Sequence, residues 1–350
     1  MIKAGIIGGA GYTGGEMLRI LVNHPDVEIA FVHSKSNAGN FISDVHTDLF
    51  GDTDLKFCGN EVLEALSLGE GLGEADILFL CVGHGDARKF LEANPVAERI
   101  KIIDLSQDFR LKANSSLSGR LGGAFVYGLP ELNRDSIKTA KNIANPGCFA
   151  TGIQLGLLPL AAKGLLKSEV HINATTGSTG AGQSLSATSH FSWRNNNLSV
   201  YKVFTHQHLQ EISESLNQLQ PGFLPVSELS LLERAAQKLT IIPQRGDFTR
   251  GILAAMYTDC DLSLEEVQNL YEDYYANEPF THVSRKNIDL KQVVNTNKCL
   301  IYLEKHGNRL FIVSITDNLL KGASGQAVQN MNLLFGLDER AGLRLKAVGF

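Results

Sequence analysis

The 350-residue sequence has no surplus of positive charge and no apolar run close to the 18 or so residues that a membrane-spanning helix requires. Its 32 Lys and Arg residues stand against 37 Asp and Glu, which leaves a formal charge of -5. Such a balance disfavours binding to phosphate backbones and to anionic lipid. The N-terminal segment has no cationic signal region. We therefore expect no nucleic-acid partner, no membrane partner and a cytoplasmic location.

Paired cysteines are also missing. The five cysteines, Cys58, Cys81, Cys148, Cys260 and Cys299, are odd in number, far apart and free of any C-x-x-C pair. This pattern excludes a disulfide framework and a zinc knuckle, so no metal is expected. Small buried packing residues are the ordinary interpretation for four of them.

The N-terminal part of the chain alternates short apolar runs with segments of helical spacing. Four runs read as strands: Ile2–Ile7, Val27–Val32, Ile77–Val82 and Ile100–Leu105. Repeated strand-helix units predict an α/β domain with a doubly wound parallel sheet of the Rossmann type over about the first 147 residues.

The pattern of apolar and polar residues changes after residue 150. Strand-like runs recur at Val170–Ala174, Leu239–Ile242, Ile252–Tyr257 and Leu310–Ile315, separated by long polar loops and a helix over Ser263–Asn277. This pattern predicts a second, α+β domain built on a mixed or antiparallel sheet. A length of 350 residues with 43% hydrophobic residues suits two such domains.

A glycine cluster joins the first predicted strand to the first helix. Gly9-x-Gly11-x-x-Gly14 matches the dinucleotide fingerprint, and Gly8 adds a variant of it in the same place. The end of the second strand carries Ser34-Lys35-Ser36 where an NAD-binding chain has an acidic residue. A cation and two hydroxyls favour NADP(H), although a solvated loop lysine remains the alternative for Lys35.

Cys148 lies where the two sequence patterns meet, just before a segment with helical spacing over Gly152–Leu158. A position near a helix N-terminus favours the thiolate, which is the nucleophilic form. His206 and His208 are candidate proton carriers for it. Ordinary packing histidines and a metal-binding pair are the alternatives, but no further ligand at a familiar spacing completes a metal site.

Two more polar segments need an explanation. Asp104–Arg110 begins at the carboxyl end of a strand, where open α/β sheets bind ligands, and Arg110 has the fork geometry that clamps phosphate or carboxylate. A salt bridge to Asp108 or Asp104 is its structural alternative. Thr176–Gly182 is a second amide-rich loop, or else a simple turn.

Six motifs in order resemble one known family, the N-acetyl-gamma-glutamyl-phosphate reductases, which are related to aspartate-semialdehyde dehydrogenases. The resemblance covers nearly the whole chain. Its motifs are Gly8–Gly14, Asp104–Arg110, Tyr127–Asn133, Asn145–Thr151, Gly177–Gly182 and Asp317–Asn332.

The resemblance implies a glyceraldehyde-3-phosphate dehydrogenase-like fold and NADPH-dependent reduction of an acyl phosphate to an aldehyde and inorganic phosphate, through a Cys148 thioester. It implies His208 as the proton carrier, His206 for substrate orientation, and Arg110 with Ser106 for the substrate phosphate. The residues implied for the cofactor are Gly8, Gly11, Tyr12, Thr13, Gly14, Ser34, Lys35, Ser36, Ser178, Gly180 and Asn318.

It also implies an NADP-binding domain of residues 1–147 to which residues 323–350 return, a catalytic and oligomerisation domain of residues 148–322, and a homo-oligomer, dimer or tetramer. The chain departs from the family pattern at Gln207, where the family usually has Arg, and over Leu209–Ile212. N-acetyl-glutamyl 5-phosphate is the default substrate, with N-succinyl and aminoadipyl substrates left open. Aspartate-semialdehyde dehydrogenase and a non-catalytic NADP-binding redox regulator are the rival functions.

Overall fold

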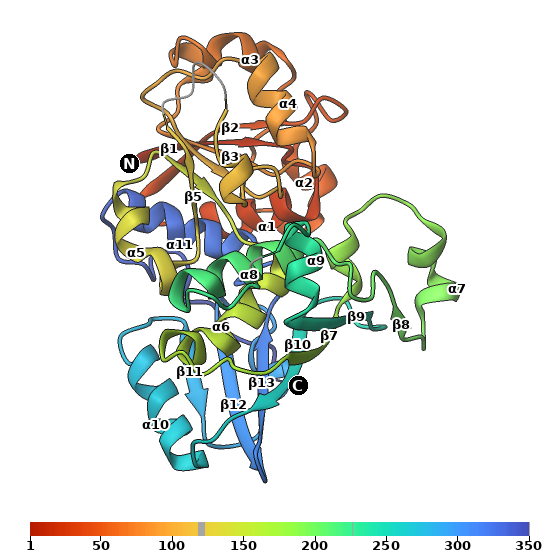
Figure 1. Ribbon diagram of the computed structural model, residues 1–350. Coiled ribbons are helices and arrows are strands. Elements are labelled where there is room, and N and C mark those ends of the chain that lie inside the picture. The colour runs from red at the N-terminus through yellow and green to blue at the C-terminus, as the bar shows by residue number, and fades with distance from the viewer. Residues whose placement is uncertain (118–122, 226, 350) are drawn as a thin grey trace. The chain divides into compact units, whose positions relative to one another are not determined.

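The computed structural model describes residues 1–117, 123–225 and 227–349 and divides into two compact units (Figure 1). Unit 1 comprises Met1–Pro146 and Ala323–Arg344, and unit 2 comprises Gly147–Gly322 and the residues from Leu345 on. Of the returning segment expected over residues 323–350, Ala323–Arg344 group with unit 1, whereas the residues from Leu345 on group with unit 2. Phe350 lies outside the described residues.

Unit 1 is built on a six-stranded sheet in which every pair of neighbours is parallel, in the order β2-β1-β3-β4-β6-β5. The strand order reverses between β1 and β3, which is the point where open α/β sheets bind ligands. Its strands are β1 (Ile2–Ile7), β2 (Val27–His33), β3 (Ile77–Leu80), β4 (Lys101–Asp104), β5 (Phe125–Tyr127) and β6 (Asn142–Ala144). Its helices are α1 (Tyr12–Leu21), α2 (Ile42–Val45), α3 (Glu61–Leu66), α4 (Asp86–Ala93), α5 (Pro130–Thr139) and α11 (Ser324–Leu334).

Helix α11 completes the core of unit 1 although it comes from the other end of the chain. All eleven of its residues are buried, and it packs between α1 and α5. The Ser324 hydroxyl donates to the Thr13 carbonyl at 2.8 Å, and the Asn330 amide donates to the Gly128 carbonyl at 2.9 Å. The apolar spacing of Gly325–Phe335 therefore reflects burial on every side.

Unit 2 is built on a seven-stranded sheet in the order β11-β12-β13-β10-β7-β9-β8. The β11–β12 and β7–β9 pairs are parallel and the other four are antiparallel, so the sheet is mixed as predicted. Its strands are β7 (Val170–Thr176), β8 (Ser199–Val200), β9 (Leu239–Arg245), β10 (Ile252–Asp259), β11 (Thr281–Ser284), β12 (Cys299–His306) and β13 (Arg309–Thr316). Its helices are α6 (Cys148–Ala162), α7 (Phe191–Arg194), α8 (His208–Leu219), α9 (Leu231–Ala236) and α10 (Leu264–Tyr275).

Helix α6 forms the centre of unit 2. It packs on β10, β12 and β13, while α8 and α10 pack on it. Every residue from Phe149 to Ala161 is buried, which explains an apolar sequence with no polar stripe. Helix α10 is more amphipathic and starts at a capping box, in which Ser263 and Glu266 satisfy each other's backbone N–H groups.

Within the described part of the chain, no helix combines the length and apolarity needed to cross a membrane. The same residues contain no group of three or more His, Cys, Asp or Glu side chains arranged to hold a metal ion.

Candidate active site

The glycine loop of unit 1 has the tight geometry that the fingerprint predicts. Gly8 has φ 78°, and a Cβ there would lie 2.5 Å from the Cys81 carbonyl oxygen. A Cβ on Gly14 would lie 2.6 Å from the Gly9 carbonyl oxygen. Glycine is therefore required at both positions, by the backbone turn at Gly8 and by the close approach of helix and loop at Gly14. Tyr12, Thr13 and Gly14 form the first turn of α1.

A groove of about 870 Å³ opens beside this loop. Gly8, Gly11, Ser34, Lys35 and Ser36 line it, so the structure brings together residues from two predicted segments. The Ser34 hydroxyl is buried and accepts a hydrogen bond from the Asn37 amide at 3.2 Å, while the side chain of Lys35 is exposed.

The residues on the third side of the groove were not predicted from the sequence. Val82, Asp86, Lys89 and Phe90 line it from the end of β3 and from α4. Lys89 lies 3.5 Å from Asp86 and adds a second cation to the groove. No motif marks these residues, although the parallel sheet places the end of β3 beside the end of β1. Bare loop backbone, two lysines and two serines fit the pyrophosphate and 2′-phosphate of NADP(H).

The Asp104–Arg110 segment is largely buried. The Arg110 guanidinium donates to the carbonyls of Asn145 at 2.8 Å and Leu105 at 3.0 Å. The Ser106 hydroxyl donates to the Asp104 carboxylate at 2.8 Å and accepts the Asp108 N–H at 3.1 Å. Burial raises the pKa of Asp104 to about 6, against the lowering effect of Ser106 and Arg110. Arg110 therefore supports the backbone at Asn145, before Cys148, whereas Ser106 holds its own segment together.

Cys148 is the first residue of α6 and is half-buried, with Gly147 as the N-cap. The predicted helix thus begins earlier than Gly152, directly at the cysteine. The exposed amides and the dipole of this 15-residue helix favour a thiolate at its first position. The Gly147 N–H donates to the buried Glu211 carboxylate at 3.1 Å, which fixes the turn into the helix.

The two histidines face each other beside this turn. Their ring centroids are 4.5 Å apart, and the ring of Phe149 lies against both, at 5.6 Å from His206 and 6.3 Å from His208. The His206 Nδ1 accepts the backbone N–H of His208 at 3.2 Å. The His208 Nε2 lies 3.7 Å from the Glu211 carboxylate. The structure therefore brings Cys148, His206 and His208 together and adds Glu211, for which the sequence analysis predicts no role.

Tyr201 and Arg245 complete the cluster in unit 2. The centroid of the Tyr201 ring lies 5.9 Å from that of His206. The Arg245 guanidinium stacks over the Tyr201 ring, 4.8 Å from its centroid. Burial first, and then the charge of Cys148, raise the pKa of Tyr201 to about 12, while Arg245 acts in the opposite direction. Among the described residues, the buried Nε of Arg245 has no hydrogen-bond partner. A cation with an unused donor therefore lies in the cluster around Cys148.

The Gly177–Gly182 loop is braced by Asn318. The Asn318 amide donates to the Thr179 hydroxyl at 3.0 Å and accepts the Gly251 N–H at 2.8 Å. A Cβ on Gly180 would lie 4.0 Å from the Asn318 amide nitrogen, so these two predicted cofactor residues are neighbours. Ser178 begins the short 3₁₀ turn Ser178–Ala181 of the same loop.

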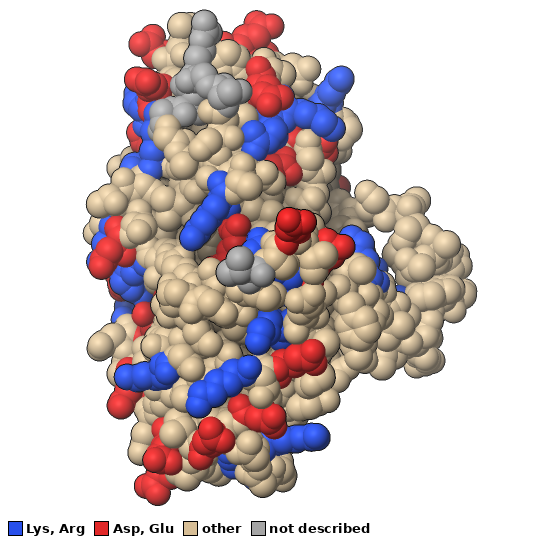
Figure 2. Space-filling model, in the orientation of Figure 1, with Lys and Arg blue, Asp and Glu red and all other residues tan. Residues whose placement is uncertain are grey.

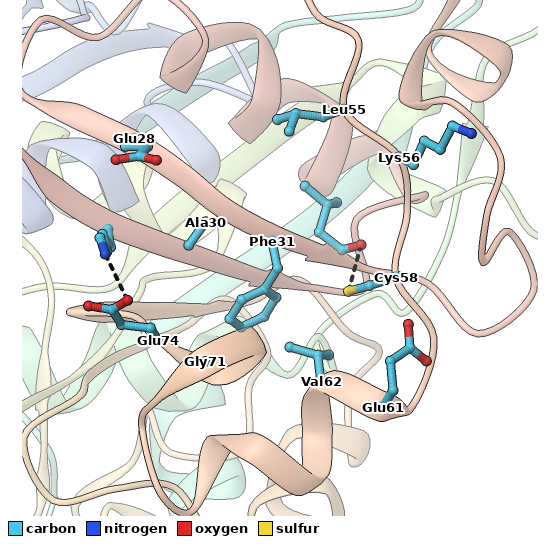
Figure 3. A pocket seen from close by; sticks show the side chains of 12 residues that line it. Glu28, Ala30, Phe31, Leu55, Lys56, Cys58, Glu61, Val62, Gly71 and Glu74 are labelled. Atoms are coloured by element: carbon cyan, nitrogen blue, oxygen red, sulfur yellow. Dashed lines mark hydrogen bonds and ion pairs between the residues drawn. The ribbon is translucent and has the colours of Figure 1, made fainter.

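A second cavity in unit 1, of about 310 Å³, contains none of the predicted site residues (Figure 3). Cys58 lines it and donates its thiol to the Val32 carbonyl at 3.3 Å. Burial raises the pKa of Cys58 to about 11 and that of Cys81 to about 12, so both stay protonated at neutral pH. Cys81, Cys260 and Cys299 are buried as predicted for packing residues, whereas Cys58 is only half-buried.

Family models of known proteins match both the N-terminal part of the chain and the part that begins at Cys148. Residues 3–140 match the family model described as the semialdehyde dehydrogenase NAD binding domain, and residues 148–318 match the semialdehyde dehydrogenase dimerisation domain. The N-acetyl-gamma-glutamyl-phosphate reductases of Bacteroides thetaiotaomicron and Flavobacterium johnsoniae are each 56% identical to this chain over 350 residues, with 100% of both chains covered. This chain belongs to the N-acetyl-gamma-glutamyl-phosphate reductase family.

Solved structures of aspartate-semialdehyde dehydrogenases share the fold of this reductase-family chain. The Vibrio cholerae enzyme II complexed with ASA has a TM-score of 0.68 at 14% identity, covering 96% of this chain and 98% of its own. The Candida albicans enzyme with NADP has a TM-score of 0.67 at 15% identity, covering 98% and 99%. The predicted fold class, a Rossmann-type sheet followed by a mixed-sheet domain, is confirmed.

Proposed function

We propose that this chain catalyses the NADPH-dependent reduction of N-acetyl-glutamyl 5-phosphate to N-acetyl-glutamate 5-semialdehyde and inorganic phosphate, in arginine biosynthesis. The observation that carries the proposal is the identity of 56% over the full chain to reductases of that name. The cluster of Cys148, His206 and His208 in unit 2 suits this chemistry.

The NADP-binding domain is residues 1–147 with the returning segment 323–350, and unit 1 contains most of it. Gly8, Gly11 and the first turn of α1 hold the pyrophosphate, and Ser34, Lys35 and Ser36 hold the 2′-phosphate. NADPH supplies the hydride that reduces the thioester carbon. Ser178, Gly180 and Asn318 are the remaining residues assigned to cofactor binding.

The Cys148 thiolate attacks the acyl carbon of the substrate. The carbon–oxygen bond to phosphate breaks, phosphate leaves with the electron pair, and a thioester remains on the sulfur. After reduction, the thiohemiacetal on Cys148 collapses to the aldehyde and returns the thiolate. The start of α6 stabilises this thiolate at both ends of the cycle.

His208 moves the proton and His206 orients the substrate. The His206 Nδ1 is used as an acceptor for the His208 N–H, so in the neutral ring the proton lies on Nε2 and serves as a hydrogen-bond donor. His208 faces the Glu211 carboxylate, which stabilises its protonated form. Arg110 and Ser106 bind the leaving phosphate, and Arg245 binds the substrate carboxylate.

The dimerisation-domain model that matches residues 148–318 supports a homo-oligomer, dimer or tetramer, assembled through unit 2.

The reverse reaction provides the test. With N-acetyl-glutamate semialdehyde, NADP and inorganic phosphate, we expect NADPH to form only when phosphate is present, and we expect Cys148→Ser to abolish it. Cys58→Ser is the matched control, because that thiol lies in a separate cavity and should leave the rate unchanged. Turnover without phosphate, or none at all, would overturn the proposal. The N-succinyl and aspartate aldehydes assayed alongside identify the acyl group.

A further inference from the structure

His46 is a buried histidine of unit 1 that belongs to none of the six sequence motifs. It follows α2 directly and is 8% exposed. Its Nε2 lies 2.8 Å from the carbonyl oxygen of Gly9, and a carbonyl oxygen can only accept a hydrogen bond. Nε2 is therefore the donor, so in the neutral ring the proton lies on Nε2. A side chain 37 residues away in the sequence thus binds the middle of the glycine loop.

The first helix leaves room for this ring at Gly15. A Cβ on Gly15 would lie 2.5 Å from the His46 Nδ1 and 2.6 Å from its Cε1, which is closer than van der Waals contact permits. Gly15 lies within α1 and outside the G-x-G-x-x-G fingerprint, and a glycine inside a helix lowers the stability of that helix. The close approach of the His46 ring explains why a glycine stands there.

Ion pairs hold the segment that carries His46 against α1. The Asp48 carboxylate lies 3.0 Å from the Arg19 Nε, and the Arg19 Nη1 lies 3.0 Å from the buried carboxylate of Glu16. The N–H of Leu49, a residue that is itself buried, donates to the His46 carbonyl at 3.0 Å. The imidazole therefore reaches the glycine loop from a segment that is fixed on the first helix.

The hydrogen bond from His46 fixes the direction of one peptide group. The peptide between Gly9 and Ala10 is trans, so the Gly9 C=O and the Ala10 N–H lie in one plane and point in opposite directions. Because the carbonyl points at the buried imidazole, the Ala10 N–H points away from it. Ala10 and Gly11 line the nucleotide groove. The orientation of this peptide thus decides where a loop N–H beside the groove is aimed.

Such local donors matter because the surface charge is mixed. Over unit 1, the face shown in Figure 2 carries Lys and Arg interspersed with Asp and Glu. Interspersed charges produce no broad positive field on that face, so the attraction of a phosphate depends on the groups next to it. A backbone N–H is one of these groups, and its hydrogen bond weakens steeply when it is misaligned.

We propose that His46 is a positioning residue for nucleotide binding, which holds the Gly9 carbonyl and thereby aims the Ala10 N–H at the pyrophosphate of the dinucleotide. This inference rests on the proposed binding of NADP(H) at the glycine loop. The pyrophosphate is common to NADP and NAD, whereas Lys35 acts on the 2′-phosphate that only NADP carries. His46 therefore sets the affinity for both dinucleotides and leaves the choice between them to the segment after β2.

Equilibrium binding to the full chain is the first test, measured by competition with fluorescent NADPH. His46→Ala removes the donor, and we expect the Kd values of NADP and NAD to rise by the same factor, about 10-fold. The Kd of adenosine 2′-monophosphate, which has no pyrophosphate, should stay that of the wild type. His46→Gln keeps an amide nitrogen as donor and should restore most of the affinity. A loss confined to NADP, or an equal loss for the monophosphate, would contradict the proposal.

His24→Ala is the matched control, because His24 is also a buried histidine of unit 1. It is 5% exposed, and its Nε2 lies 3.1 Å from the side-chain oxygen of Asn332. We expect both alanine variants to lose thermal stability and only His46→Ala to lose nucleotide affinity. Equal nucleotide affinities in the two variants would overturn this inference alone. A wild type that binds no NADP would overturn the proposed function and this inference with it.

Gly15→Ala tests the contact from the other side. The added methyl group takes the space of the His46 ring, so this variant should weaken NADP binding to a degree similar to His46→Ala. In the double variant Gly15→Ala/His46→Ala the ring is absent, and the methyl group should cause no further loss. The four Kd values for NADP complete the cycle. Losses that multiply would show that Gly15 and His46 act separately, against the proposal.

Discussion

The buried carboxylate of Glu211 accepts the backbone N–H of Gly147 at 3.1 Å, across 64 residues of sequence. Gly147 is the N-cap of α6 and precedes Cys148, so one side chain on α8 fixes the turn that presents the thiol. The other oxygen of the same carboxylate lies 3.7 Å from the His208 Nε2. Glu211 therefore links the position of the proposed nucleophile to that of the proposed proton carrier.

Glu211→Gln tests this link. Glutamine keeps an oxygen for the Gly147 N–H but removes the negative charge opposite His208. We expect kcat to fall by roughly 10²-fold, as when a general acid-base is impaired, with the KM for the aldehyde little changed. The control is Glu214→Gln, the same substitution one turn along α8. A rate equal to that of the control would contradict the role of Glu211.

Arg245→Gln removes the cation stacked on Tyr201. If Arg245 binds the substrate carboxylate, the KM for N-acetyl-glutamate semialdehyde should rise by about 10-fold or more, because a charge-assisted hydrogen bond is lost. The KM for NADP should not change. Arg285→Gln is the control, since Arg285 is an exposed partner of Glu272. Initial rates over a matrix of both substrates separate the two constants, and an equal rise in both would argue against the assignment.

Lys35→Ala tests the cofactor preference. Lys35 lines the groove between Ser34 and Ser36, in the segment after β2 where an NAD-binding chain has an acidic residue. We expect the KM for NADPH to rise by about 10-fold and that for NADH to stay the same, because only NADPH carries the 2′-phosphate. Lys138→Ala, an exposed lysine paired with Asp135, serves as the control. Equal effects on the two nucleotides would remove Lys35 from the phosphate site.

Asp104 makes the stability of unit 1 depend on pH. Burial raises its pKa to about 6, from about 3.9 in an unfolded chain, so between these values the folded state binds more protons. The free energy of unfolding should therefore fall as the pH rises from about 4 to about 6, by about 3 kcal/mol for this group. Asp104→Asn should lack this component. Urea midpoints of both proteins measured at several pH values check the difference, and parallel profiles would contradict it.

The sequence alone determined the features that depend on residues close together in the chain. The strand-helix alternation predicted the parallel sheet, because burial repeats at short, fixed intervals in each element. The glycine loop could also be predicted, since Gly8 and Gly14 lie where backbone geometry excludes a side chain. The position of Cys148 near a helix N-terminus followed from its neighbours, although the exact start of α6 did not.

Only the tertiary structure decided which distant side chains meet. Glu211 reaches the cluster around Cys148 because α8 packs on α6. Tyr201 and Arg245 come from the segment before α8 and from β9, which packs against α8. Lys89 enters the nucleotide groove because β3 pairs with β1. Their meeting could not be predicted, since a contact between elements depends on strand order and helix packing, which leave no periodic mark in the sequence. Leu185, Phe191 and Leu198 are the same case: they resemble core residues in the sequence, and the structure shows them exposed among the described residues of unit 2.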